Sequence, residues 1–170
     1  LCNMKTAILF LFVAGTCAAQ SVGFLFGPGF GAFNNTWKTG VPVWSAGVLV
    51  DNQIGDHGGT MIGLHYRQRG EKSTTMHAVQ FDIAGQYIGT RIRTGAGAFF
   101  ALSAGARSDT EPPQKLGSGV GVSGFFAVQV RRNLSARIVY DHGLGNLSDD
   151  AGRKVTAQAA YLLIEYRIFK

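Results

Sequence analysis

Residues 77–87 read His-Ala-Val-Gln-Phe-Asp-Ile-Ala-Gly-Gln-Tyr, with apolar side chains at alternate positions. In an extended chain, Val79, Phe81 and Ile83 lie on one face, whereas Gln80 and Asp82 lie on the other. A period of two is typical of a β-strand, because successive side chains point to opposite sides of a sheet. The stretch therefore predicts a strand with one apolar face and one polar face.

The same alternation recurs along the rest of the chain. It is found in residues 20–33, 41–51, 58–68, 92–103, 119–130, 134–141 and 160–168. Tight joints near Gly89 and Arg132-Asn133 alternate with longer polar connectors, although the joint at 52–57 is longer than expected. Eight strands with short turns at one end predict an all-β fold, an eight-stranded antiparallel up-and-down transmembrane β-barrel.

A glycine motif, Gly119, Gly121 and Gly124, has the G-x-G-x-x-G spacing of a dinucleotide-binding loop. That loop requires a helix after the glycines. Residues 125–130 are instead Phe-Phe-Ala-Val-Gln-Val, which favours a strand. We therefore expect Gly119, Gly121 and Ser123 to face the barrel lumen and to leave room for bulky neighbours.

The first residues indicate a secretory leader. Lys5 is followed by an apolar run at 7–14 and by the small-x-small sequence Cys17-Ala18-Ala19. We expect residues 1–19 to be a cleaved signal peptide and residues 20–170 to be one barrel domain. Lipidation of Cys17 is the alternative, and Thr16 disfavours it. Both cysteines fall in the leader, so no disulfide or cysteine metal site is expected in the mature chain.

Composition bears on which face of the barrel is outside. Only 15% of the residues are charged, and 24 are glycine. The non-apolar face is mostly small, and aromatic residues end the apolar segments at Trp44, Tyr66, Tyr87, Tyr140 and Tyr166. These features favour an apolar face in lipid, with aromatic girdles, over a soluble lipocalin-like ligand-binding barrel. The mature net charge of +5 is spread along the chain and does not indicate nucleic-acid binding.

Three stretches carry a resemblance to a known group: 64–72, 140–147 and 166–169. With them the chain resembles the small outer-membrane β-barrel proteins of the PorT-like or OmpA/OmpX-like kind, Bacteroidetes type. The resemblance implies a bacterial outer-membrane location. We expect a non-catalytic structural or accessory role in the cell envelope, with docking to a secretion or envelope complex as one form of it. Outer-membrane lipid, lipopolysaccharide and a protein of such a complex are the expected partners.

Polar residues of the inward face form the candidate site. They are His65, Arg67, Gln80, Asp82, Gln86, Arg91, Arg93, Arg137, Asp141, Glu165 and Arg167. Because unpaired buried charges are costly, we expect Asp82 to pair with Arg91 or Arg93, Glu165 with Arg137, and Asp141 with Arg67. Eight strands leave no aqueous channel, so a packed polar plug is favoured over a conducting pore.

Two further hypotheses concern the polar residues outside that set. A lipid A-modifying enzyme would need a nucleophile beside a histidine, and the candidates are His77 after Ser73–Thr75 and His142 beside Asp141 and Ser148. Neither set is a known motif, so we expect no catalytic residue, and we expect no metal site and no cofactor. Basic residues near the long loops, Arg69, Lys72, Arg107 and Lys115, are candidate contacts for lipopolysaccharide phosphates.

Overall fold

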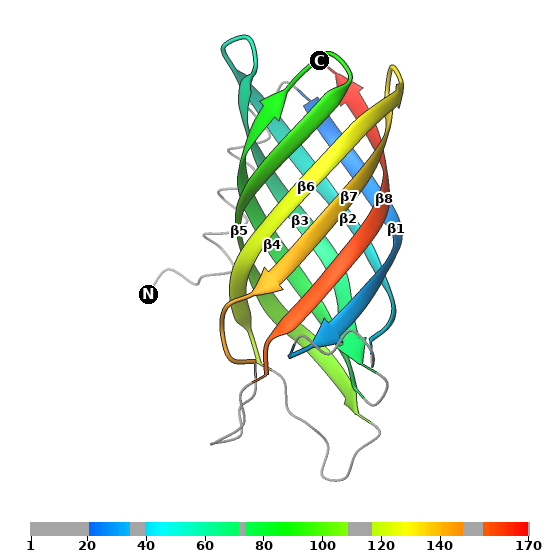
Figure 1. The fold of residues 1–170 in the computed structure, drawn as a ribbon, viewed down its shortest axis with the longest axis vertical. Helices are drawn as coiled ribbons and strands as arrows, with labels where there is room; N and C mark the ends of the chain where they lie inside the picture. The colour runs from blue at the N-terminus through cyan, green and yellow to red at the C-terminus, as the bar shows by residue number, and fades with distance from the viewer. Residues whose placement is uncertain (1–20, 35–39, 72–73, 109–116, 148–154, 170) are drawn as a thin grey trace.

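The computed structural model describes residues 21–34, 40–71, 74–108, 117–147 and 155–169, so the predicted signal peptide lies outside the described residues. The strands are β1 (Ser21–Phe33), β2 (Val41–Ile54), β3 (Gly58–Glu71), β4 (Thr74–Ile88), β5 (Ile92–Ser108), β6 (Gly119–Arg131), β7 (Leu134–Gly143) and β8 (Ala157–Phe169). The prediction of eight antiparallel strands is confirmed (Figure 1).

Several strands are longer than the segments predicted from alternation. β4 begins at Thr74 and β5 continues to Ser108, so part of the expected polar connectors belongs to the strands. The joint at 52–57 is also a tight turn, because β2 continues to Ile54 and only three residues precede β3. Gly55 adopts a φ of 68° in this turn, a conformation that glycine accepts without strain.

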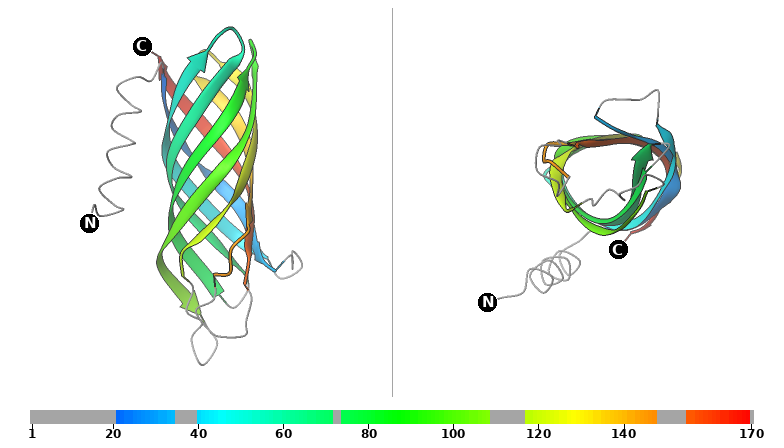
Figure 2. Two further views of the ribbon diagram at one scale, coloured as in Figure 1. Left: turned by 90° about the vertical axis from the view of Figure 1, so that its left-hand side faces the viewer. Right: turned by 90° about the horizontal axis from the view of Figure 1, so that it is seen from below.

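The sheet closes through the pairing of β1 with β8, and it forms a ring when seen along its axis (Figure 2). Following cross-strand partners around the barrel from Ser21 leads back to β1 at Gly31, ten residues further on. With ordinary strand spacings, this stagger tilts the strands by roughly 40° from the barrel axis. The barrel is therefore narrow, with an interior that side chains can fill.

The outer wall is apolar. Exposed large apolar side chains occur on every strand, and the aromatic residues predicted to form girdles are among them. Trp44 is 57% exposed and Tyr87 is 50% exposed. No helix among the described residues is long and apolar enough to cross a membrane.

Glycines make room for large side chains in the interior. A Cβ atom at Gly121 would collide with the ring of Phe99, and one at Gly95 would lie 2.7 Å from the ring of Phe125. Gly119 faces Leu147 in the same way. The lumen-facing role predicted for Gly119 and Gly121 is thus confirmed. The interior also contains aromatic rings and long polar side chains, so it is more completely filled than it would be with small residues alone.

Candidate functional site

Most of the residues predicted to face the lumen do lie there. Ten of the eleven are buried or half-buried inside the barrel: His65, Arg67, Gln80, Asp82, Gln86, Arg93, Arg137, Asp141, Glu165 and Arg167. Arg91 is the exception and corrects the prediction, because it precedes β5 in the turn and its side chain is exposed. The interior charges form two networks.

The first, the loop-end network, consists of His65, Arg67, Arg69, Gln80, Asp82 and Asp141, from β3, β4 and β7. Asp141 is fully buried, and its Oδ2 accepts hydrogen bonds from Arg67, from Arg69 at 3.0 Å and from Gln80 at 3.3 Å. Asp82 accepts from Arg67 at 3.3 Å and from Gln80 at 2.6 Å. Both carboxylates therefore have guanidinium partners, as buried charges require.

His65 belongs to the same network and depends on small neighbours. Its Nε2 lies 3.0 Å from Oδ2 of Asp82. A Cβ atom at Gly47 or at Gly63 would collide with the imidazole ring. Two glycines on neighbouring strands therefore leave the space in which the imidazole lies beside Asp82.

The second, the turn-end network, consists of Ser21, Asp51, Gln86, Arg93, Arg137, Glu165 and Arg167. Glu165 accepts from Nε of Arg137 at 2.5 Å and from Arg167. Arg167 also pairs with Asp51, which Arg93 approaches at 3.4 Å. The guanidinium of Arg137 lies 4.0 Å from the centre of the Phe125 ring, a cation–π contact.

Two predicted pairs form and one does not. Arg67 pairs with Asp141, and Arg137 pairs with Glu165, as expected. The expected pairing of Asp82 with Arg91 or Arg93 is wrong. Across β4 and β5, Arg93 lies opposite Ile88, whereas Asp82 lies opposite Phe99, so the arginine is too far along the barrel.

A small hollow separates the two networks. It is lined by His65, Arg67, Asp82 and Arg137 together with apolar side chains that include Leu25, and its volume is about 10 Å³. A cavity needs roughly 10–15 Å³ to hold one water molecule. The hollow is thus at most about the size of a single water molecule.

Among the predicted lipopolysaccharide contacts, Arg69 needs correction. It is 1% exposed, and its guanidinium bonds Gln80 and Asp141 and lies 4.6 Å from the Phe99 ring centre. Its position two residues after Arg67 on one strand was the signal for an inward side chain. Lys72, Lys115 and the side chain of Arg107 lie outside the described residues.

Other interior residues were missing from the predicted set. Asp51 joins the turn-end network, and Ser21 donates to it at 3.2 Å. Tyr161 is also inside, and its hydroxyl donates to the carbonyl of Gln68 at 2.7 Å. All three positions have the alternation of the inward face, so period two was the signal that could have identified them.

The histidines of the enzyme hypothesis lie on the outer face. The hydroxyl of Tyr66 and Nδ1 of His77 are 2.5 Å apart, and their rings stack. His142 bonds Gln158 at 3.0 Å and stacks on Tyr140. Ser73 and Ser148 lie outside the described residues. No group of three metal-ligating side chains is found in the part of the chain that the structure describes.

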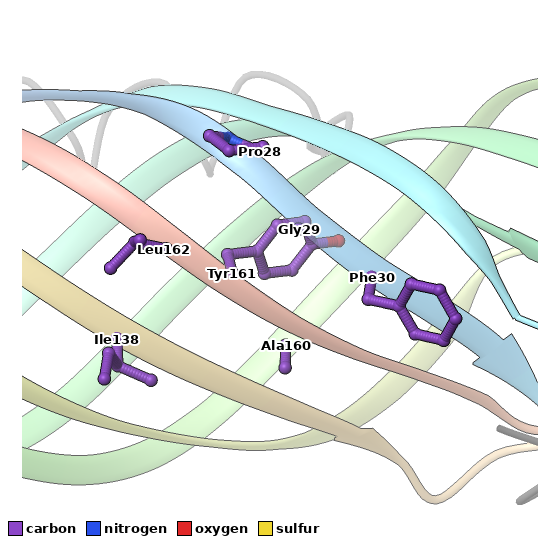
Figure 3. A pocket seen from close by; sticks show the side chains of 7 residues that line it. All are labelled: Pro28, Gly29, Phe30, Ile138, Ala160, Tyr161 and Leu162. Carbon is purple, nitrogen blue, oxygen red and sulfur yellow. The ribbon is translucent and has the colours of Figure 1, made fainter.

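The outer wall has an apolar hollow where β1, β7 and β8 meet (Figure 3). Ala160 is a small residue there, and Phe30, Ile138 and Leu162 are larger side chains around it. No charged side chain lines the hollow, so it belongs to the apolar wall and lacks the polar groups of an active site.

No known family model and no curated protein matches the chain. Solved structures do. Neisserial surface protein A is 13% identical, with 86% of this chain and 95% of that chain covered and a TM-score of 0.55. OprG from Pseudomonas aeruginosa is 10% identical, with 90% and 98% covered and a TM-score of 0.52. The N-terminal β-barrel domain of Pseudomonas aeruginosa OprF is 13% identical, with 88% and 98% covered and a TM-score of 0.50. At such identities the likeness concerns the fold, which is that of the small eight-stranded outer-membrane barrels.

Proposed function

We propose that this protein is an outer-membrane barrel of the bacterial envelope with a structural or accessory role, closed to solutes and without catalytic activity. The observation that carries the proposal is the separation of charge from the outer wall. The charged side chains that the structure describes within the strands and away from the short turns lie inside the barrel, whereas large apolar side chains cover the outside. A wall of that kind is stable against hydrocarbon and unfavourable against water.

The interior supports the closed state. The two networks contain buried guanidiniums paired with buried carboxylates, and aromatic rings lie against Arg69 and Arg137. Moving one of these side chains aside would break a buried ion pair, which costs several kcal/mol. A barrel closed by side chains that hold each other in place has no path for solutes.

Membrane insertion and conductance test this proposal together. The full chain, refolded into vesicles, should resist extraction by alkaline carbonate and should migrate differently on a gel with and without boiling. In planar bilayers it should give no steady conductance. Release by carbonate would exclude the membrane barrel and favour a soluble ligand-binding barrel, whereas stable open channels would exclude the closed interior.

The accessory role needs a separate measurement, because a closed barrel with no catalytic site acts through what it contacts. A tag inserted in the 105–116 segment would allow pull-down from outer membranes in mild detergent. A stoichiometric protein that co-elutes with the heat-shifted barrel is the result expected for the accessory role and for the PorT-like kinship. Elution of the folded barrel alone would contradict docking and leave a self-sufficient structural barrel.

A further inference from the structure

The exposed charges of the described residues lie at one end of the barrel. Outside the interior, the described charged side chains are Asp56, Arg91, Arg131 and Arg132, and all four lie in or next to the short turns. These turns join β2 to β3, β4 to β5 and β6 to β7, at the end where β8 finishes (upper end in Figure 1). Three of the four residues are arginines. We call Arg91, Arg131 and Arg132 the arginine rim.

One residue, Gln129, contacts both of the turns that carry the arginine rim. The backbone nitrogen of Gln129 donates to the carbonyl of Arg91 at 2.8 Å. The side-chain amide of the same Gln129 donates to the carbonyl of Arg132 at 2.8 Å. The β4–β5 and β6–β7 turns are thereby fixed side by side, and the three arginines lie in one sector of the barrel end.

The charge of this sector is not neutralised within the described structure. Among the described residues, no ion pair joins a rim arginine to an acid. Asp56 lies on the β2–β3 turn. The backbone nitrogen of Ile88, at the end of β4, donates to the carbonyl of His57 on that turn. The acid is therefore on the side of the β4–β5 turn that faces away from the β6–β7 turn. The carboxylate of Asp51 is already paired with Arg93 and Arg167 inside the barrel. The rim therefore presents three positive charges to its surroundings.

The apolar wall ends directly at the arginine rim. Ile92 follows Arg91 and is 44% exposed, and Val130 precedes Arg131 and is 63% exposed. If these side chains lie in hydrocarbon, the adjacent guanidiniums lie at the depth of the lipid headgroups. Guanidinium binds phosphate oxygens through paired hydrogen bonds, and basic residues near an anionic surface are attracted to it.

We infer that the arginine rim is a binding site for the phosphates of anionic phospholipids in the leaflet that surrounds the turn end. The inference rests on the proposed membrane placement. The ligand is a phosphodiester whose lipid has a net negative charge, because a zwitterionic headgroup would bring its own ammonium to the three arginines. This site is distinct from the basic residues first considered for lipopolysaccharide, none of which belongs to the β2–β3, β4–β5 or β6–β7 turn.

Lipid titration of the purified full chain tests the inference. The barrel is refolded in neutral detergent, titrated with phosphatidylglycerol or with phosphatidylcholine, and the bound lipids are counted by native mass spectrometry. Wild type should prefer phosphatidylglycerol on the order of tenfold or more, since each basic residue near an anionic surface contributes up to about fivefold. R91Q/R131Q/R132Q should lose that preference, and added salt should weaken it in wild type.

A matched variant controls for net charge. K72Q/R107Q/K115Q also removes three positive charges, none of which belongs to the β2–β3, β4–β5 or β6–β7 turn, and should keep the preference. Equal loss in both variants, or retention in the rim variant, would overturn the inference. Complete displacement of the lipid by millimolar inorganic phosphate would assign the rim to free phosphate and overturn the lipid assignment.

Folding of each variant is measured in parallel, so that a failure of the proposed membrane function can be distinguished from a failure of the proposed lipid site. Each variant is examined for the heat-dependent gel shift, and R132Q alone serves if the triple variant does not fold, with a partial loss of preference expected. A wild-type chain that does not insert into vesicles would overturn the proposed membrane function. An inserted wild type whose rim variants bind phosphatidylglycerol normally would overturn only the lipid site.

Discussion

Replacing Asp141 by asparagine should destabilise the barrel more than any single change to an exposed charge. Asp141 is fully buried on β7, and its Oδ2 accepts from Arg67, from Arg69 and from Gln80. Asparagine conserves the shape and removes the negative charge. Its amide nitrogen also brings a donor into a site where the neighbours are donors, and its remaining oxygen accepts only as a neutral group, so the two guanidiniums lose the negative charge that they share.

The expected loss of unfolding free energy in Asp141→Asn follows from the contacts that remain. A hydrogen bond to a charged group contributes about 1.5–3 kcal/mol, and Asp141 makes two with guanidiniums. Breaking a buried ion pair costs about 3–5 kcal/mol. Asp82 still accepts from Arg67 at 3.3 Å, so only Arg69 loses its single carboxylate partner among the described residues. We therefore expect the free energy of unfolding to fall by about 3 kcal/mol, at the lower end of that range.

Denaturant titration of the barrel in neutral detergent, followed by the heat-dependent gel shift, measures this change. The control is Asp56→Asn, an exposed acid on a turn, which should change the unfolding free energy by less than about 0.5 kcal/mol. The combination of Asp141→Asn with Arg69→Met should be less unstable than the sum of the two single variants, because the unpaired cation is removed. An Asp141→Asn barrel as stable as wild type would refute the reasoning that this network stabilises the interior.

Three other predictions use the two faces of the wall. Gly121→Leu should lower stability by more than about 2 kcal/mol through overpacking, whereas Gly85→Leu, at an open outer position, should cost less than about 1 kcal/mol; denaturant titration compares them. Ile138→Arg, far from the ends of β7, should destabilise the barrel in lipid vesicles by about 2–4 kcal/mol, and Val130→Arg, at the edge of the wall, by about 0–1 kcal/mol. His77→Ala should leave the lipid A mass profile of whole cells unchanged, and an altered profile would favour the enzyme hypothesis.

Much of the fold could be predicted because a strand has a period of two. The inward or outward direction of a residue such as Asp82 or Trp44 follows from its place in the alternation, with no knowledge of its neighbours. The same rule places Arg69 and Asp51, at the ends of their segments, inside the barrel, although neither was among the residues predicted to face the lumen. Those ends were the weak point, since β4 and β5 extend into segments whose polar composition resembles loops.

The pairing inside the barrel required more than the alternation. Asp82 and Arg93 share a face and lie on adjacent strands, yet they are apart because the β4–β5 register places Arg93 opposite Ile88. The tight turn at 89–91 sets that register, so part of the pairing between β4 and β5 could have been inferred from the sequence. Asp141 and Arg69 are 72 residues apart, on β7 and β3, and contact each other across the interior.

The sequence by itself determined the strands, their number and the two faces, because each depends on the local direction of a side chain. The tertiary structure alone decided which charges meet, where Phe99 and Phe125 fit against glycines, and which arginines are left outside. Those facts depend on the stagger with which the ring closes and on the narrow space it encloses, and both are properties of all eight strands together.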